Sequence, residues 1–208
     1  MLVSEKHNFL FIHIYKNAGT SITSALSPFA LSNGGWMAYK ILKKLNISTP
    51  FFDPHPFPSH IKAPDIIDIL GREKFASLFS FAIIRNPWDW QVSLYKYMLK
   101  EEAHFQHELV KELGSFEEYI KWRCKNDVTC QKDFIYSENN ELLVNYVGRY
   151  ENLESDFNKI CDHIGISASL PRMNVSNTKP YQEYYTEKTK DLVRQAYELD
   201  INTFDYSF

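Results

Sequence analysis

The chain alternates short apolar runs with longer segments in which apolar residues recur at helical spacing. Residues 9–15 (FLFIHIY) and 79–84 (FSFAII) are nearly continuous apolar runs rich in aromatic and β-branched residues, and this pattern predicts buried strands. Residues 142–150 (LLVNYVGRY) predict a third strand. Strands that alternate with helices indicate an α/β fold with a mainly parallel central sheet flanked by helices.

Amphipathic segments lie between the predicted strands. A helix is expected to start within residues 21–26, and residues 63–79 predict another helix with Pro64 in its first turn. Further helices are predicted at residues 88–99, 105–113, 116–124, 152–164 and 186–199. Residues 28–58 are irregular, and a connection of this length inside a compact fold is usually functional or mobile.

Composition limits the class of protein. The 208 residues predict one domain, and a content of 44% hydrophobic and 15% aromatic residues excludes intrinsic disorder. Because 23 basic residues face 26 acidic residues, the net charge of −3 offers no general attraction for nucleic acid. No window holds the roughly 20 apolar residues of a membrane-spanning helix, and the N-terminus lacks the features of a signal peptide. We therefore expect a soluble, cytoplasmic protein.

The cysteine pattern indicates neither a disulfide framework nor a zinc site. Cys124, Cys130 and Cys161 are too few and too irregularly spaced for either. They are expected to be buried or idle thiols, and a Cys124–Cys130 bridge is left open.

A turn rich in hydrogen-bond donors follows the first predicted strand. It consists of Lys16, Asn17, Ala18, Gly19, Thr20 and Ser21. The N–H groups and partial positive charge of the following helix start attract an anion, Lys16 adds a cation, and Gly19 allows close approach of the backbone. Because the lysine precedes the glycine, the turn lacks the G-x-x-x-x-G-K-[ST] pattern, which disfavours a Mg²⁺-dependent ATPase. The alternative is an ordinary turn with an exposed lysine.

A second polar pattern follows the next predicted strand. Arg85 ends that strand, Asn86 is a natural N-cap, and Pro87 fits the first helical position. An arginine, with Ser93 about two turns further on, suits a phosphate monoester; the alternative is a structural ion pair for Arg85 and a solvated serine. Ligands bind at the carboxyl ends of parallel strands, so the two patterns together predict a ligand with two separate anionic ends.

The two patterns, in this order and spacing, resemble those of the sulfotransferases. KNAGTS after FIHIY is similar to the 5′-phosphosulfate loop of that family, and RNPWDWQVSLYKY is similar to its 3′-phosphate motif. Residues 59–71, 147–161 and 170–208 resemble further segments of the family-2 type, which includes the carbohydrate sulfotransferases and many bacterial proteins. The resemblance covers most of the chain and implies a P-loop-like sulfotransferase fold, with residues 1–208 forming a complete catalytic domain.

The resemblance also implies a reaction. A sulfuryl group would move in line from 3′-phosphoadenylyl sulfate (PAPS) to an acceptor hydroxyl, leaving 3′,5′-adenosine bisphosphate (PAP), without a metal ion. Lys16 would stabilise the leaving group, the rest of the turn would hold the phosphosulfate, and Arg85 and Ser93 would hold the 3′-phosphate. His60 matches the family's histidine and is the expected base, because imidazole accepts a proton at neutral pH; His55 is the second candidate. His13 is expected to be a packed core residue.

Two parts of the site are less defined by sequence. Ser176, Lys179 and Tyr181 lie in a polar segment that, in the family, closes over the nucleotide; the alternative is a solvated loop. The stretches outside the resemblance, about residues 29–58 and 100–136, should hold the acceptor, which we expect to be a carbohydrate or another hydroxyl compound. Two alternatives are a P-loop kinase of a small substrate and a non-catalytic nucleotide- or glycan-binding module. The oligomeric state is left open.

Overall fold

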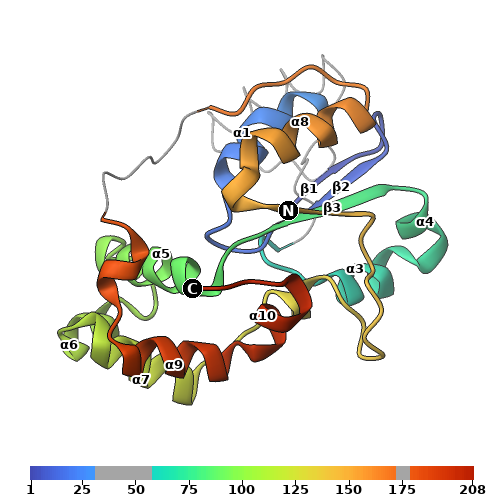
Figure 1. The fold of residues 1–208 in the computed structure, drawn as a ribbon. Helices are drawn as coiled ribbons and strands as arrows, with labels where there is room; N and C mark the ends of the chain where they lie inside the picture. Colours follow the sequence, from blue (N-terminus) through green and yellow to red (C-terminus); the bar gives the residue numbers. More distant parts are fainter. Residues whose placement is uncertain (31–57, 172–178) are drawn as a thin grey trace. The chain divides into compact units, whose positions relative to one another are not determined.

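The computed structural model describes residues 1–30, 58–171 and 179–208 (Figure 1). The chain forms two compact units, the first made of Met1–Ile84 and Asp133–Val175 and the second of Arg85–Lys132 and Ser176–Phe208. The first unit contains the sheet, and the second unit is helical.

The first unit is built on a 4-stranded sheet in the order β1-β2-β3-β4. Its strands are β1 (Leu2–Ser4), β2 (Phe9–Ile12), β3 (Phe79–Ile84) and β4 (Tyr146–Arg149). β2, β3 and β4 pair in parallel, which confirms the predicted type of sheet. β1 pairs antiparallel with β2 and was not predicted, because a three-residue strand is too short to show a pattern.

Helices α1 (Gly19–Ala30) and α8 (Leu153–His163) both contribute buried residues to the core that covers the sheet. Ile22 of α1 and Phe157 of α8 pack with Phe11 and Phe81 of the strands in the buried core. The single helix predicted at residues 63–79 is instead two short helices, α3 (Ala63–Leu70) and α4 (Arg72–Ala76). Gly71 separates them at φ 82°, a conformation that a helix cannot contain.

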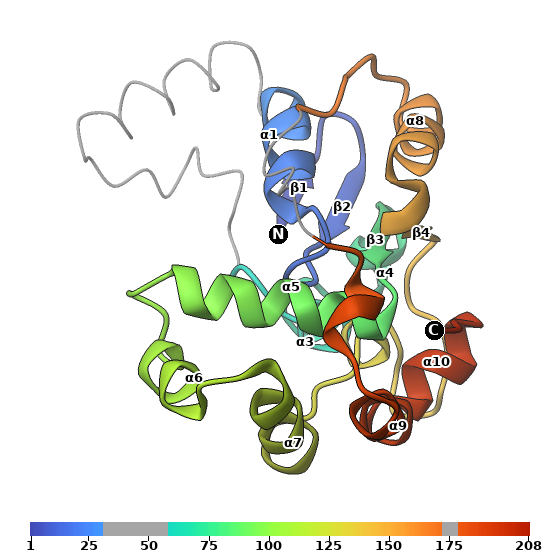
Figure 2. The same ribbon diagram turned by 60° about the vertical axis from the view of Figure 1, so that its left-hand side comes forward.

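The second unit contains five α-helices among its described residues. They are α5 (Pro87–Lys100), α6 (His107–Leu113), α7 (Phe116–Asn126), α9 (Glu187–Ala196) and α10 (Glu198–Phe204). α7 packs against α9, and α5 contacts α6, α7 and α9 (Figure 2). The helix predicted at residues 186–199 is interrupted at Tyr197, whose fully buried ring lies edge-on to Trp90.

Three 3₁₀ turns complete the described structure: η1 (Lys132–Phe134), η2 (Tyr150–Asn152) and η3 (Tyr181–Tyr184). Within the described ranges, no helix combines the length and apolarity needed to cross a membrane. All three cysteines are free thiols, so the structure does not form the bridge between Cys124 and Cys130 that the sequence left open.

Candidate active site

The turn after β2 has a backbone conformation suited to an anion. Lys16 and Ala18 adopt φ values of 64° and 60°, although neither residue is glycine. The left-handed conformation costs such a residue roughly 1–2 kcal/mol, and strain of this kind is concentrated at functional sites. A left-handed residue beside one with negative φ can turn successive N–H groups toward one side, where they form a concave anion site. The turn leads directly into α1, whose first N–H groups have no partner within the helix.

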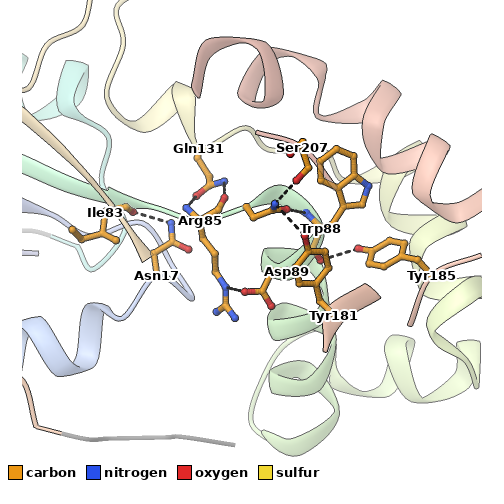
Figure 3. A network of polar contacts seen from close by, with 10 residues as sticks. Asn17, Ile83, Arg85, Trp88, Asp89, Gln131, Tyr181, Tyr185 and Ser207 are labelled. Carbon is orange, nitrogen blue, oxygen red and sulfur yellow. Dashed lines mark hydrogen bonds and ion pairs between the residues drawn. The ribbon is translucent and has the colours of Figure 1, made fainter. Parts of the chain in front are cut away.

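Asn17 anchors this turn to the neighbouring strand. Its side chain is buried, and its Nδ2 donates a hydrogen bond of 2.8 Å to the carbonyl oxygen of Ile83 (Figure 3). β2 and β3 are parallel neighbours, so their carboxyl ends lie at the same edge of the sheet. The Asn17 side-chain amide therefore holds the turn against β3. Because that amide donates to Ile83, the prediction that Asn17 binds the ligand now concerns its backbone N–H.

The space in front of Gly19 is filled by His13. A Cβ at position 19 would lie 1.7 Å from His13 Nε2, so no side chain fits beside the imidazole. The sequence explained Gly19 by close approach of a ligand, whereas the structure adds a neighbour from the same chain. His13 follows β2 and is only partly buried, and its ring stacks on Phe11 with centroids 5.7 Å apart. His13 was expected to be a packed residue of the core; its ring is packed, but the residue is only partly buried.

His60 lies beside His13 with a defined arrangement of its proton. Its Nδ1 lies 3.1 Å from the backbone carbonyl oxygen of His13. Because a carbonyl only accepts, Nδ1 carries the proton and Nε2 of the neutral ring is the acceptor that a general base needs.

Packing also favours the neutral form of His60. Its ring contacts His13 and Tyr15, with centroid distances of 4.6 Å and 5.7 Å. The residue as a whole is exposed, but desolvation of this packed ring lowers the pKa of His60, and the hydrogen bond to His13 opposes the shift in part. The imidazole is therefore neutral at pH 7, as a proton acceptor must be.

Arg85 is held through both its backbone and its side chain. Its N–H donates to Gln131 Oε1 at 2.8 Å, and its carbonyl oxygen accepts from Gln131 Nε2 at 2.7 Å. Its Nε donates to Asp89 Oδ2 at 2.8 Å, in an ion pair that leaves the Arg85 side chain 11% exposed. The structural ion pair considered as an alternative is thus present. The terminal guanidinium nitrogens extend away from Asp89, so this pair orients the group rather than enclosing it (Figure 3).

Asn86 caps α5 as the sequence predicted. Its Oδ1 accepts from the Trp88 N–H at 3.1 Å, and Pro87 occupies the first helical turn. Its Nδ2 donates to the carbonyl oxygen of Ser207 at 2.7 Å and lies 3.4 Å from the Tyr181 hydroxyl (Figure 3). Tyr181, a candidate for the nucleotide site, therefore contacts Asn86, the second residue of the predicted 3′-phosphate motif.

The remaining predicted residues occupy varied environments. Ser93 is half-buried in α5, on the same helix face as Asp89, because residues four apart share a face. Lys179 is exposed and forms a surface ion pair with Glu183 at 3.8 Å. Thr20 is exposed and Ser21 is largely buried, both in the first turn of α1. Ser176, His55 and residues 31–57 of the stretch expected to hold the acceptor lie outside the described residues.

Gln131 and Asp200 support the site without a signal in the sequence. Both are fully buried, and the Asp200 carboxylate accepts from the backbone N–H groups of Gln131 and Lys132, each at 2.8 Å. Their distance from Arg85 along the chain leaves no local pattern to recognise. Asp89 is different, because it lies only four positions after Arg85, at the start of a predicted helix, where the sequence alone shows a cation close to an acid.

Comparison with known proteins agrees with the two motifs. The family model described as "Sulfotransferase family" matches residues 1–207. The chain belongs to the sulfotransferase family. The predicted family, enzyme class and fold are thereby confirmed.

Two individual proteins are similar to this sulfotransferase. Mouse sulfotransferase SULT7A1, in a crystal structure complexed with PAP, has the same fold with a TM-score of 0.54 and 11% sequence identity, covering 98% of this chain and 88% of that chain. An uncharacterized protein of Archaeoglobus fulgidus is 28% identical over 116 residues, which are 55% of this chain and 91% of that protein.

A metal centre has no visible ligand set in the described ranges. Residues 1–30, 58–171 and 179–208 contain no group of three or more His, Cys, Asp or Glu side chains arranged to hold a metal ion. Activity without a metal stays a prediction for experiment.

Proposed function

We propose that this sulfotransferase moves a sulfuryl group from PAPS to an acceptor hydroxyl, with residues 1–208 acting as one catalytic domain. The observation that carries the proposal is the turn between β2 and α1, where two non-glycine residues adopt left-handed conformations and Asn17 ties the backbone to β3. Mouse SULT7A1, which shares the fold, was crystallised with PAP. Membership of the family favours sulfuryl transfer over a P-loop kinase or a binding module without catalysis.

The donor fits the chemistry of both motifs. We assign the phosphosulfate to the turn of Lys16, Asn17, Ala18, Gly19, Thr20 and Ser21, which offers backbone N–H groups, hydroxyls and a cation. The 3′-phosphate is assigned to Arg85 and Ser93, since a guanidinium provides several donors for a phosphate, and Ser176, Lys179 and Tyr181 are further candidates. When bound, PAPS supplies the sulfuryl group that the acceptor oxygen takes up as PAP leaves.

Lys16 and His60 have separate tasks in the proposed reaction. The Lys16 ammonium stabilises the negative charge that develops on the leaving oxygen. His60 Nε2 takes the proton from the acceptor hydroxyl, while the hydrogen bond from Nδ1 to the His13 carbonyl keeps the ring oriented. No step of the proposed reaction uses a metal ion.

The chemical class of the acceptor is inferred from the family. The family-2 type includes the carbohydrate sulfotransferases, and we therefore propose a carbohydrate hydroxyl as acceptor. We further propose that the reaction takes place in the cytoplasm.

Ligand-dependent stability tests the donor. A ligand that binds only the folded state stabilises it by about 2.7 kcal/mol at 100 times its dissociation constant. PAP should raise the melting temperature at concentrations where ATP–Mg²⁺ has little effect. Absence of a shift with PAP, or an equal shift with ATP–Mg²⁺, contradicts the proposal. Isotopically labelled PAPS offered with a panel of oligosaccharides then identifies the acceptor.

A further inference from the structure

His13 contacts both parts of the first unit that the proposed reaction uses. Its ring centroid lies 4.6 Å from that of His60, with the two ring planes inclined by 59°. On the phosphosulfate side, its Nε2 fills the place that a Cβ of residue 19 would take. One imidazole therefore touches the expected base and the first residue of α1.

Within residues 1–30, 58–171 and 179–208, few side chains contact His60. Residues 58–60 are exposed, and they precede α3, which begins at Ala63. In the described part of the chain, the His60 ring contacts His13 and Tyr15, and its Nδ1 is within hydrogen-bond distance of the His13 carbonyl.

The two contacting rings are themselves anchored in the core. His13 stacks on Phe11, which is 1% exposed, and Tyr15 lies edge-on to Phe134, which is 3% exposed. The position of the exposed His60 ring is therefore fixed, through His13 and Tyr15, by buried aromatic residues.

We propose that His13 is a positioning residue: its imidazole sets the place of the His60 ring relative to the turn before α1, and Gly19 is glycine because it leaves room for that imidazole. The role of His60 as base rests on the proposed function, whereas the packing of the three residues does not.

Two different substitutions should disrupt the same contact, that between the rings of His13 and His60. His13→Ala removes the ring that supports His60. Gly19→Ala places a methyl group where the ring lies, and the His13 side chain can move at lower cost than the backbone of α1. The displaced ring then loses its contact with His60, so both changes should release the same histidine.

Histidine-ring NMR tests this without an acceptor. In the unaltered protein, His60 should carry its proton on Nδ1, and its pKa should lie below the ordinary value. In His13→Ala and in Gly19→Ala, the Nε2-protonated ring should appear and the His60 pKa should rise, because water reaches the ring. Among the described residues, the charged and titratable groups facing His60 are His13, Tyr15 and the N-terminal ammonium, and only His13 changes in the first variant.

A double variant and a matched control sharpen the test. His13→Ala/Gly19→Ala should match His13→Ala alone, since the methyl group then meets no ring. His163→Ala, which removes an exposed histidine from the last turn of α8, should leave the His60 signals unchanged. With an acceptor that the unaltered enzyme uses, kcat of His13→Ala should fall roughly 10–100-fold while KM for PAPS changes little.

Two results would overturn the inference: a His60 tautomer and pKa unchanged in His13→Ala, or a Gly19→Ala effect that persists fully without His13. Failure of the unaltered protein to bind PAP would instead contradict the proposed function, and it would leave the NMR comparison valid.

Discussion

The side-chain nitrogen of Asn17 donates a 2.8 Å hydrogen bond to the carbonyl oxygen of Ile83, which joins the turn after β2 to the neighbouring parallel strand. Both residues are 1% exposed, so the bond is shielded from water. A buried polar contact of this kind stabilises the turn in the absence of ligand, and this preorganisation reduces the cost of binding an anion.

Replacement of that donor should weaken both folding and nucleotide binding. Asn17→Asp keeps the shape but places a carboxylate oxygen against a carbonyl oxygen. The free energy of unfolding should fall by roughly 1–3 kcal/mol in urea denaturation, and PAP should bind more weakly in calorimetry. Asn8→Asp is the control, because Asn8 is exposed and also left-handed. Equal stability of the two variants would refute the anchoring role.

Loss of the Lys16 ammonium should affect the reaction more than the fold. For Lys16→Ala we expect kcat to fall about 10²–10³-fold, the effect of removing one group that stabilises developing negative charge. PAP release from PAPS measures the rate, and circular dichroism checks the fold. Lys74→Ala, which removes only a surface ion pair with Glu5, should behave like the unaltered protein. Near-normal transfer by Lys16→Ala would remove this lysine from the mechanism.

The pH dependence of the rate should reveal the pKa of His60. The base acts in its neutral form, and its lowered pKa keeps it neutral to lower pH than an ordinary histidine with a pKa near 6.5. The acid limb of kcat/KM should therefore have its midpoint below 6.5. His60→Gln should lose most of the activity and also this limb. An unchanged limb in the variant would assign it to another group.

The same pKa has a consequence for stability. The unfolded chain protonates His60 more readily than the folded protein does, so the contribution of His60 is intact above the unfolded pKa and stability is lost as pH falls below it. His60→Gln should show less of this loss in urea denaturation between pH 7 and pH 5.

Discrimination between two nucleotides should depend on Arg85. PAP and adenosine 5′-phosphate differ by the 3′-phosphate that we assign to this guanidinium. Arg85→Ala should weaken PAP about 10–100-fold, as expected for one charged hydrogen-bonding group, and change the binding of adenosine 5′-phosphate little. Arg72→Ala, at an exposed arginine of α4, is the matched control. If both nucleotides weaken equally in Arg85→Ala, the residue does not read the 3′-phosphate.

Elements whose signals are local could be predicted from the amino-acid sequence. β3 has the bounds that its apolar run predicted, and α5 begins after the Asn86 cap with Pro87 in its first turn. The order and spacing of the two motifs also identified the family that the comparison confirms. Two predicted helices were too long because the breaks, at Gly71 and Tyr197, depend on a left-handed turn and on a ring buried by packing.

How the candidate residues are held depends on contacts between distant parts of the chain. Asn17 meets Ile83 across 66 positions of the chain, His60 meets His13 across 47, and Gln131 meets Arg85 across 46. Contacts over such separations leave no periodic pattern in the sequence, because they arise when strands and loops are packed together. Sequence could therefore identify the turn, Arg85 and His60 as candidates for the site, whereas only packing could assign the proton on His60 and the neighbour that requires glycine at position 19.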